Sequence, residues 1–381
     1  MNLVNIQGSG DIAITPASGR DDVASALERV DPTGSWRNWW HQASGVPVRL
    51  SDGASVPGAT PVHRFSPLEG GAGPDPLLGI NVGGHYLRLV RVCGGTVVGS
   101  REMRLGTGHE SALSGISLRS FVELLTGDEL SHEVQGVGIA WSAPRTSIGL
   151  RAMSILTEVG GEVFDLLDAG ELDNALTKAL GCPVLSWNDG EAVAAAEALA
   201  RPPGEGRSLL ALKLGTSFAS GLALGTHQVS ALPLQLAKCL PTSPPLECFA
   251  HPMTGLHGTA RDALGAACVT EAFRRLADLP QADYEDYCRA AVRGHPVAMR
   301  LARSAARVVA ELAHLVRNLG SPVDLVLSGR NLRQLPYRQM FTGLVRRELA
   351  LHPSGVTLLD PAGDVSLSAA LGAAALSRAH T

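Results

Sequence analysis

The sequence of 381 residues is poor in aromatic side chains, at 4%, and has no surplus of positive charge, since its formal net charge is −4. The missing basic surplus argues against nucleic acid as a partner. No apolar run approaches the roughly 18 residues that a membrane helix needs, so we expect no membrane partner. The first residues also lack a basic segment followed by an apolar core, which a signal peptide would show. We therefore expect a cytoplasmic protein.

The six cysteines are scattered, and no CxxC pair occurs among them. This excludes a dense disulfide framework and favours reduced thiols that pack as small apolar residues. Glycine (43) and proline (23) are plentiful, which indicates many turns and close backbone approaches. The length is sufficient for two domains of roughly 100–200 residues, each with its own core.

Residues 1–76 are predicted to form a partly ordered N-terminal extension, because glycine, proline and serine dominate much of it. A short helix is expected over 21–30, and a tryptophan cluster follows at 36–40. Packing of these tryptophans onto the main body is a simpler interpretation than a partner-binding patch. A flexible linker is expected near 70–76.

From Leu77 onward, the pattern of a glycine-interrupted hairpin followed by alternating strands and helices occurs twice. The hairpins are LLGINVGGHYLRLVRV and SLLALKLGTSFASGLALG. Such an internal repeat is typical of duplicated α/β domains. We predict domains at 77–187 and 188–365, and a C-terminal helix within 366–381 that packs back on the first domain.

A polar pair, Asn188-Asp189, directly follows a short apolar strand and precedes an alanine-rich helical pattern. Open α/β sheets bind ligands at the carboxyl ends of their strands. An aspartate at a helix start is also a common N-cap, favoured by the helix dipole. Position alone leaves both interpretations of Asp189 open.

Seven segments resemble, in the same order, the motifs of the ROK family of sugar kinases and glucokinases, which belongs to the actin/hexokinase/Hsp70 superfamily. The resemblance covers about 77–381. It implies an α/β fold of two duplicated actin-like (ribonuclease H-like) domains flanking a cleft. The segments are GINVGGHYLRLVRV, GVGIAWSAPR, CPVLSWNDGEAVAAAEAL, LKLGTSFASGLALG, LECFAHPMTG, VDLVLSGRN and LSAALGAAALSRA.

The resemblance implies ATP-dependent phosphorylation of a hydroxyl on a hexose, aminosugar or cyclitol, with a role in specialised metabolism. Asp189 would be the general base that takes the hydroxyl proton. Asn188 and Glu247 would hold sugar hydroxyls, and Arg145 would meet an acidic or phosphorylated ligand. An exposed loop carboxylate and a solvated arginine are the simpler interpretations of the last two. The partner would be a small molecule, and a homodimer is an allowed assembly.

The resemblance also implies a phosphate side for ATP and Mg²⁺. Glycine turns allow backbone amides to approach a phosphate, although a tight turn alone would explain them. The residues assigned to the nucleotide are Asn81, Gly83, Gly84, His85, Gly215, Thr216, Gly221, Ser328 and Gly329.

The phosphate side departs from the family pattern. Asn81 stands where the family has an aspartate that helps to hold the metal, and it lacks the charge that Mg²⁺ prefers. His85 replaces a threonine, and Ser217 and Ala219 replace glycines. The backbone at the second loop therefore has less freedom to wrap a phosphate.

The structural zinc site of the family is expected to be absent. Aligning the family's zinc motif puts Lys238, Leu240 and Pro245 at its three cysteine positions. Tetrahedral zinc needs several nitrogen or sulfur ligands at close spacing. The spacing of the remaining local candidates matches no zinc pattern; they are Cys239, Cys248, His251 and His257.

A second function remains open from these departures. The chain could be a ROK-like protein that has lost phosphoryl transfer and acts as a sugar-binding or regulatory protein, or as an enzyme of different chemistry in the same cleft. ROK repressors carry an N-terminal DNA-binding domain. The composition of residues 1–76 and the net charge of −4 argue against that version.

Overall fold

The computed structural model describes residues 76–378 and four short strands before them. The described range is interrupted at 107–110, 144, 147–148, 151–159, 202–205, 226–227, 231–235, 251–255, 320–321 and 353–354. The helix and the tryptophan cluster predicted within 21–40 lie outside the described residues. In the part of the chain that is described, no helix is both long and apolar enough to span a bilayer.

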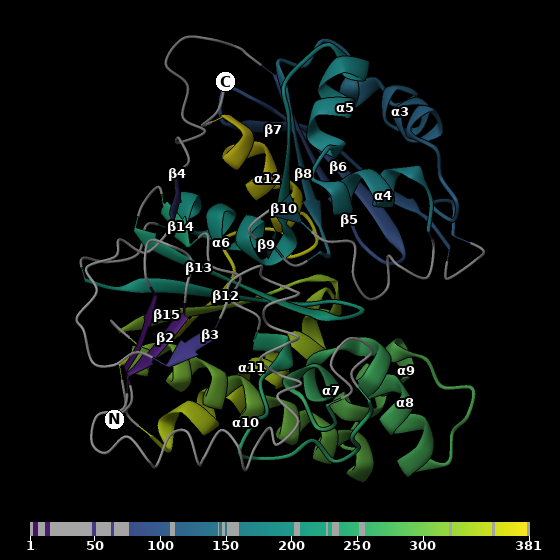
Figure 1. The fold of residues 1–381 in the computed structure, drawn as a ribbon. Coiled ribbons are helices and arrows are strands. Elements are labelled where there is room, and N and C mark those ends of the chain that lie inside the picture. Colours follow the sequence, from purple (N-terminus) through teal and green to yellow (C-terminus); the bar gives the residue numbers. More distant parts are fainter. Residues whose placement is uncertain are drawn as a thin grey trace.

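The first lobe is built on a five-stranded sheet with the order β11-β8-β5-β6-β7 (Figure 1). β5 pairs in parallel with β8, and β8 with β11, whereas β5, β6 and β7 form an antiparallel meander. The strands are β5 (Leu77–Val82), β6 (Tyr86–Cys93), β7 (Thr96–Arg104), β8 (Gly136–Trp141) and β11 (Val184–Asn188). β5 and β8 are buried at every position, as their unbroken apolar runs predict.

The helices of this lobe are α3 (Leu118–Thr126), α4 (Glu162–Ala169) and α5 (Leu172–Leu180). Their apolar side chains join those of the sheet in one core around Trp141 and Phe121. A short hairpin of β9 (Arg145–Thr146) and β10 (Gly149–Leu150) follows β8.

The second lobe is built on a six-stranded sheet with the order β16-β15-β12-β13-β14-β4. Its strands are β12 (Ser208–Leu214), β13 (Phe218–Gly225), β14 (Gln228–Ser230), β15 (Val323–Ser328) and β16 (Val356–Leu359). Its helices are α7 (Ala260–Leu264), α8 (Ala266–Ala277), α9 (Tyr284–Val292), α10 (Pro296–Leu319) and α11 (Leu335–Ala350). Gly265 separates α7 from α8, because it is the C-cap of the first helix and the N-cap of the second.

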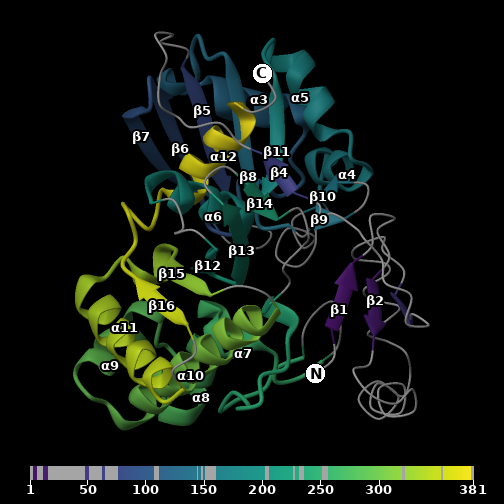
Figure 2. The ribbon, with the colours of Figure 1, turned by 90° about the vertical axis from the view of Figure 1, so that its left-hand side faces the viewer.

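The N-terminal extension contributes strands that the sequence did not predict. β4 (Val62–Arg64) pairs antiparallel with β14 and forms one edge of the second sheet. A separate small sheet consists of β1 (Leu3–Ile6), β2 (Ile12–Thr15) and β3 (Val48–Leu50) (Figure 2).

Two helices of small residues lie where the lobes meet. α6 (Asp189–Ala200) contacts β12 and β13 of the second lobe, and α12 (Ser368–Arg378) contacts α6, β5 and β8. The contact with the sheet is close, because a Cβ atom at Gly79 would lie 1.9 Å from the Ala370 carbonyl oxygen. The same atom at Gly138 would lie 2.0 Å from the Ala373 oxygen. Glycine in the strands therefore allows the last helix to seat directly on the first sheet.

Candidate active site

A cavity lies between the two lobes at the carboxyl ends of β5, β8, β11, β12 and β15. This is the edge at which open α/β sheets bind ligands. Its wall includes Asn81, Gly83, Gly84, His85, Tyr86, Arg88, Ser142, Asn188, Asp189, Lys213, Gly215, Thr216, Ser217, Ala219, Lys238, Gly329, Arg330 and Asn331. The loops after the parallel strands thus bring most of the predicted site residues together.

The N-cap of α6 is Asn188, not Asp189. The Asn188 side-chain oxygen accepts from the backbone N–H of Gly190 at 2.9 Å and of Glu191 at 3.4 Å, and Glu191 closes a capping box by accepting from the Asn188 backbone N–H. The Asn188 amide also donates to the Ala143 carbonyl oxygen at 2.8 Å. Asn188 therefore has structural roles that compete with the predicted contact to a sugar hydroxyl. The cap interpretation of Asp189 is wrong, because its carboxylate points elsewhere.

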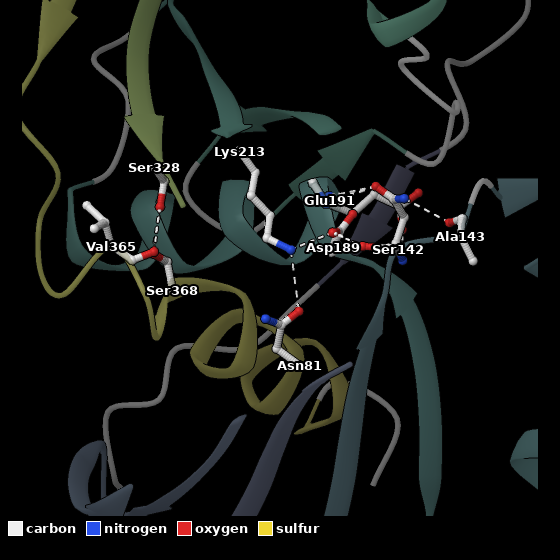
Figure 3. Close-up of polar contacts among 11 residues, drawn as sticks. Asn81, Ser142, Ala143, Asp189, Glu191, Lys213, Ser328, Val365 and Ser368 are labelled. Atoms are coloured by element: carbon white, nitrogen blue, oxygen red, sulfur yellow. Dashed lines mark hydrogen bonds and ion pairs between the residues drawn. The ribbon is translucent and has the colours of Figure 1, made fainter. Parts of the chain in front are cut away.

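The carboxylate of Asp189 is buried, with 3% of the residue exposed. Its Oδ2 atom accepts from the Ser142 hydroxyl at 2.8 Å and from the Lys213 ammonium at 2.5 Å (Figure 3). Its Oδ1 atom has no hydrogen-bond partner among the residues that the structure describes. A buried carboxylate oxygen without a donor is costly, so a ligand hydroxyl is the group that this arrangement suits.

Lys213 joins the two lobes at this point. It projects from β12, and its ammonium also lies 3.5 Å from the Asn81 side-chain oxygen on β5 (Figure 3). Sequence reasoning did not single out Lys213. The signal was present, since a lysine within the otherwise apolar strand SLLALKL must have a buried partner or a ligand.

A second contact between the lobes joins Arg330 to Tyr86. Arg330 donates to the Tyr86 hydroxyl at 2.7 Å, and its guanidinium carbon lies 3.7 Å from the centre of the ring. Tyr86 begins β6, and Arg330 follows Gly329 after β15. Arg330 and Tyr86 were also missed by the sequence analysis.

The two predicted phosphate loops both line the cavity. The Gly83 N–H closes a tight turn onto the Tyr86 carbonyl oxygen at 3.0 Å. The second loop is tied to the start of α8, because the Gly215 and Thr216 carbonyl oxygens accept from the N–H groups of Ala266 and Ala267. Each loop is thus anchored by backbone hydrogen bonds, which holds its remaining amides at the wall of the cavity.

Four predicted site residues are not part of the cavity wall as described. Glu247 is half-buried in a loop away from the wall. Gly221 lies under α6, where a Cβ atom would be 2.1 Å from the Gly190 oxygen. Ser328 is fully buried, and its hydroxyl is 2.8 Å from that of Ser368. Arg145 begins β9, but its side chain lies outside the described residues. The ligand roles of these four stay predictions.

Gly329 does line the cavity, but packing of the backbone is sufficient to require glycine at this position. Its φ is +103°, and a Cβ atom there would lie 2.2 Å from the Leu214 carbonyl oxygen. The backbone after β15 thus presses against β12, which only glycine permits. This explains the residue independently of any nucleotide.

Lys238 adds a titratable amine to the wall. It ends the short 3₁₀ turn η4 (Leu236–Lys238), and burial lowers its pKa to about 7. The charge of the cavity wall at Lys238 therefore changes near neutral pH. In the sequence, Lys238 stood out only as a replacement for a zinc-binding cysteine.

The residues around Asn81 do not fit the Mg²⁺ ion that the family resemblance implies there. Asn81 contributes a neutral amide oxygen, and the Lys213 ammonium already contacts both that oxygen and Asp189. A divalent cation prefers carboxylates and water and is repelled by an adjacent ammonium. The glycine loops and the cationic side chains of the wall do fit the phosphates of ATP.

In the described ranges, no group of three or more His, Cys, Asp or Glu side chains is arranged to hold a metal ion. His251, one of the four candidate zinc ligands, lies outside the described residues. The expectation that the family's structural zinc is missing stays a prediction.

Comparison with known proteins places the fold. No protein-family model matches the chain, and no curated protein matches it in sequence. Among solved structures, it is similar to the ROK hexokinase from Thermus thermophilus, with a TM-score of 0.57 and 22% identity over 80% of this chain and 98% of that one. A ROK family glucokinase from Streptomyces griseus, in complex with glucose and AMPPNP, has a TM-score of 0.57 and 18% identity over 80% and 99% of the two chains.

A ROK family transcriptional regulator, a homolog of the E. coli MLC protein, is equally similar, with a TM-score of 0.57 and 18% identity over 80% of this chain and 78% of that one. The chain therefore has the fold of ROK proteins. Both kinases and a transcriptional regulator share this fold. The prediction of two actin-like α/β domains around a cleft is confirmed. The individual domain boundaries stay predictions.

Proposed function

We propose that this protein transfers a phosphoryl group from ATP to a hydroxyl of a sugar or sugar-like small molecule, such as a hexose, an aminosugar or a cyclitol. The observation that carries the proposal is the Asp189 carboxylate. It is buried at a strand end in the cavity wall, held through Oδ2, and without a protein donor at Oδ1 in the described part of the chain.

Asp189 would act as general base. The substrate hydroxyl would donate its hydrogen bond to Oδ1, and its oxygen would form a bond to the γ-phosphorus of ATP. The bond from that phosphorus to the β,γ-bridging oxygen would break, the proton would pass to Oδ1, and ADP would leave. Ser142 and Lys213 would keep the carboxylate in one orientation, because both hold Oδ2. Phosphoryl transfer depends mostly on such positioning.

The proposal is tested by product formation. The purified protein is incubated with ATP and a panel of hexoses, aminosugars and cyclitols, and phosphorylated products are detected by mass spectrometry. We expect one acceptor class to yield a monophosphate together with ADP. Asp189→Asn should lose the product, whereas Asp165→Asn, a change on the exposed side of α4, should retain it. Sugar binding without a phosphorylated product from any acceptor would overturn the proposal.

A second candidate is a sugar-binding or regulatory protein without phosphoryl transfer. The contact that favours it is the 2.5 Å ion pair between Lys213 and Asp189, which neutralises the carboxylate within the protein. Under this alternative, a sugar would bind in the cavity and Asp189→Asn would change only its affinity. Calorimetric titration of the same sugar panel without nucleotide, together with the product assay, separates the two functions.

A further inference from the structure

The cavity wall carries two cations beside the position at which the family resemblance implies a metal ligand. Asn81 on β5 lies directly opposite Arg88 on β6 in the antiparallel register. Side chains of opposed residues point to the same face of the sheet. Lys213 approaches Asn81 from the other lobe, at 3.5 Å. The neutral amide of Asn81 is therefore flanked by a guanidinium and an ammonium.

Arg88 has a donor that the protein does not use. The residue is 5% exposed and lines the cavity. Its Nε atom donates to Glu102 at 2.7 Å, but its buried Nη2 atom has no partner within the described ranges. A guanidinium presents five N–H donors in a planar fork. Buried donors without an acceptor cost free energy unless a ligand accepts from them.

Other cations reinforce the positive charge around Arg88. Burial lowers the pKa of Arg88, Glu102 raises it, and the charges of Arg330 and Arg333 lower it further. Both arginines lie near Arg88, because Arg330 and Arg88 contact the Tyr86 ring at 3.7 and 5.4 Å from its centre, and Arg333 lies 3.5 Å from Glu102, the partner of Arg88. Asp189 is the acidic side chain among the described residues of the cavity wall, and it is paired with Lys213.

Lys213 is also able to bind an additional group. An ammonium has three N–H donors, and the contacts to Asp189 and Asn81 use two of them. Its remaining N–H and the free Nη2 of Arg88 flank the same amide side chain. Guanidinium groups bind phosphate oxygens in a bidentate manner, and lysine binds them as a point charge.

We propose that Arg88 and Lys213 bind the phosphates of the nucleotide directly, as side-chain cations in place of a divalent metal ion. This inference rests on the proposed function, because it assigns the phosphates to a phosphoryl donor. This role would explain why Asn81 stands at the position where the family resemblance implies an aspartate that helps to hold the metal. Glu102 and Asp189 already pair with these two cations, so an aspartate at this position would add a third carboxylate beside them, whereas the amide adds no negative charge.

The test is the metal dependence of nucleotide binding. ADP and AMPPNP are titrated calorimetrically into the full chain in EDTA and again in millimolar Mg²⁺. We expect affinities in the two buffers to agree within about threefold, since the cations are part of the protein. Affinity in EDTA should fall steeply with added NaCl, because the interaction is between charges. Binding that requires Mg²⁺ by more than about tenfold would overturn the inference. This measurement uses the unaltered protein, so it does not depend on the folding of any variant.

The residues are tested with matched variants. Arg88→Met and Lys213→Met should each weaken metal-free ADP binding by roughly tenfold or more, as expected for the loss of a charged hydrogen bond. Arg119→Met and Lys178→Met remove exposed charges of the first lobe that lie outside the cavity wall, and they should leave affinity unchanged. Circular dichroism checks that each variant is folded, and Arg88→Lys should recover part of the loss. Undiminished ADP affinity in folded Arg88→Met and Lys213→Met proteins would contradict the assignment.

The outcomes separate this inference from the proposed function. Product formation with binding that requires Mg²⁺ keeps the kinase and overturns the inference. Metal-free ADP binding that depends on Arg88 and Lys213, without any phosphorylated product, keeps the inference about phosphate binding and overturns the kinase. No nucleotide binding in either buffer overturns both. Tighter binding of a sugar monophosphate than of ADP would indicate that the two cations bind a phosphate carried by the sugar. This result would overturn their assignment to the nucleotide.

Discussion

Arg330 and Tyr86 connect the two lobes at the wall of the cavity. The arginine lies over the tyrosine ring, at 3.7 Å from its centre, and donates to its hydroxyl at 2.7 Å. Tyr86 belongs to the first sheet, and Arg330 follows strand β15 of the second sheet. The contact therefore resists the hinge motion that two-lobed enzymes use to admit ligands.

This contact predicts an energetic coupling between the lobes. Tyr86→Phe removes the hydrogen bond and keeps the ring, whereas Arg330→Met removes both the hydrogen bond and the cation over the ring. A double-mutant cycle of the two changes, measured by chemical denaturation, should give a coupling free energy of about 1 kcal/mol or more. Additive effects of the two changes would show that the contact does not stabilise the closed arrangement.

Asp189→Asn predicts a separation of turnover from binding. The amide cannot accept the hydroxyl proton, so kcat should fall by roughly 100- to 10,000-fold. The affinity for the acceptor should stay within about tenfold, because a general base acts mainly in the transition state. Steady-state kinetics and calorimetry on the same protein provide the two numbers. Equal losses in both would instead indicate a structural role for the Asp189 carboxylate.

Gly329→Ala should destabilise the protein. The residue has φ of +103° and lies against the Leu214 backbone, so a methyl group meets both strain and a clash. We expect the free energy of unfolding to fall by roughly 1–3 kcal/mol. Gly343→Ala is the matched control, because Gly343 lies within α11 with nothing within 4 Å of the added atom. It should raise stability by up to about 1 kcal/mol. A free energy of unfolding for Gly329→Ala that equals or exceeds that of Gly343→Ala would contradict this account.

Lys238 predicts a pH dependence of stability. Burial lowers its pKa from 10.5 to about 7. Between these values the unfolded chain holds a proton that the folded chain does not, so the free energy of unfolding rises with pH in this window. Below pH of about 7 both states are protonated, and the contribution is constant.

The check is to compare the wild type with Lys238→Met by chemical denaturation at several values between about pH 7 and pH 9. The free energy of unfolding of the wild type should rise relative to that of the variant as pH increases. Lys178→Met, on the exposed side of α5, should follow the wild type at each pH. A constant difference between wild type and Lys238→Met would show that the amine is not titrating in this range.

The sequence was sufficient to predict the two α/β lobes and the place of Asp189, because both follow from local patterns. Apolar runs with glycine breaks predict strands and turns, and the Asn-Asp pair marks the end of one strand. The sequence left Asp189 open as a helix cap or a site residue, whereas in the structure Asn188 is the cap and Asp189 faces the cavity. Local sequence does not decide this, because both residue types are good caps.

The cations of the site were not predicted, since their meaning depends on contacts between distant parts of the chain. Lys213 meets Asn81 across the lobes, and Arg88 faces the same region from a neighbouring strand. Each is a charged residue within an apolar strand, which is the signal that could have been weighed. The pairing of β4 with β14 was likewise not predictable, because register between distant segments leaves no local pattern.

The seat of α12 on β5 and β8 has a consequence for how the molecule is assembled. The residues that complete the core of the first sheet, including Ala370 and Ala374 against Leu77 and Val90, come from the far end of the described chain. During synthesis, the apolar face of this sheet stays uncovered until the entire second lobe has been made. Contacts so distant in sequence slow folding. The first lobe to be synthesised is therefore the last to complete its packing.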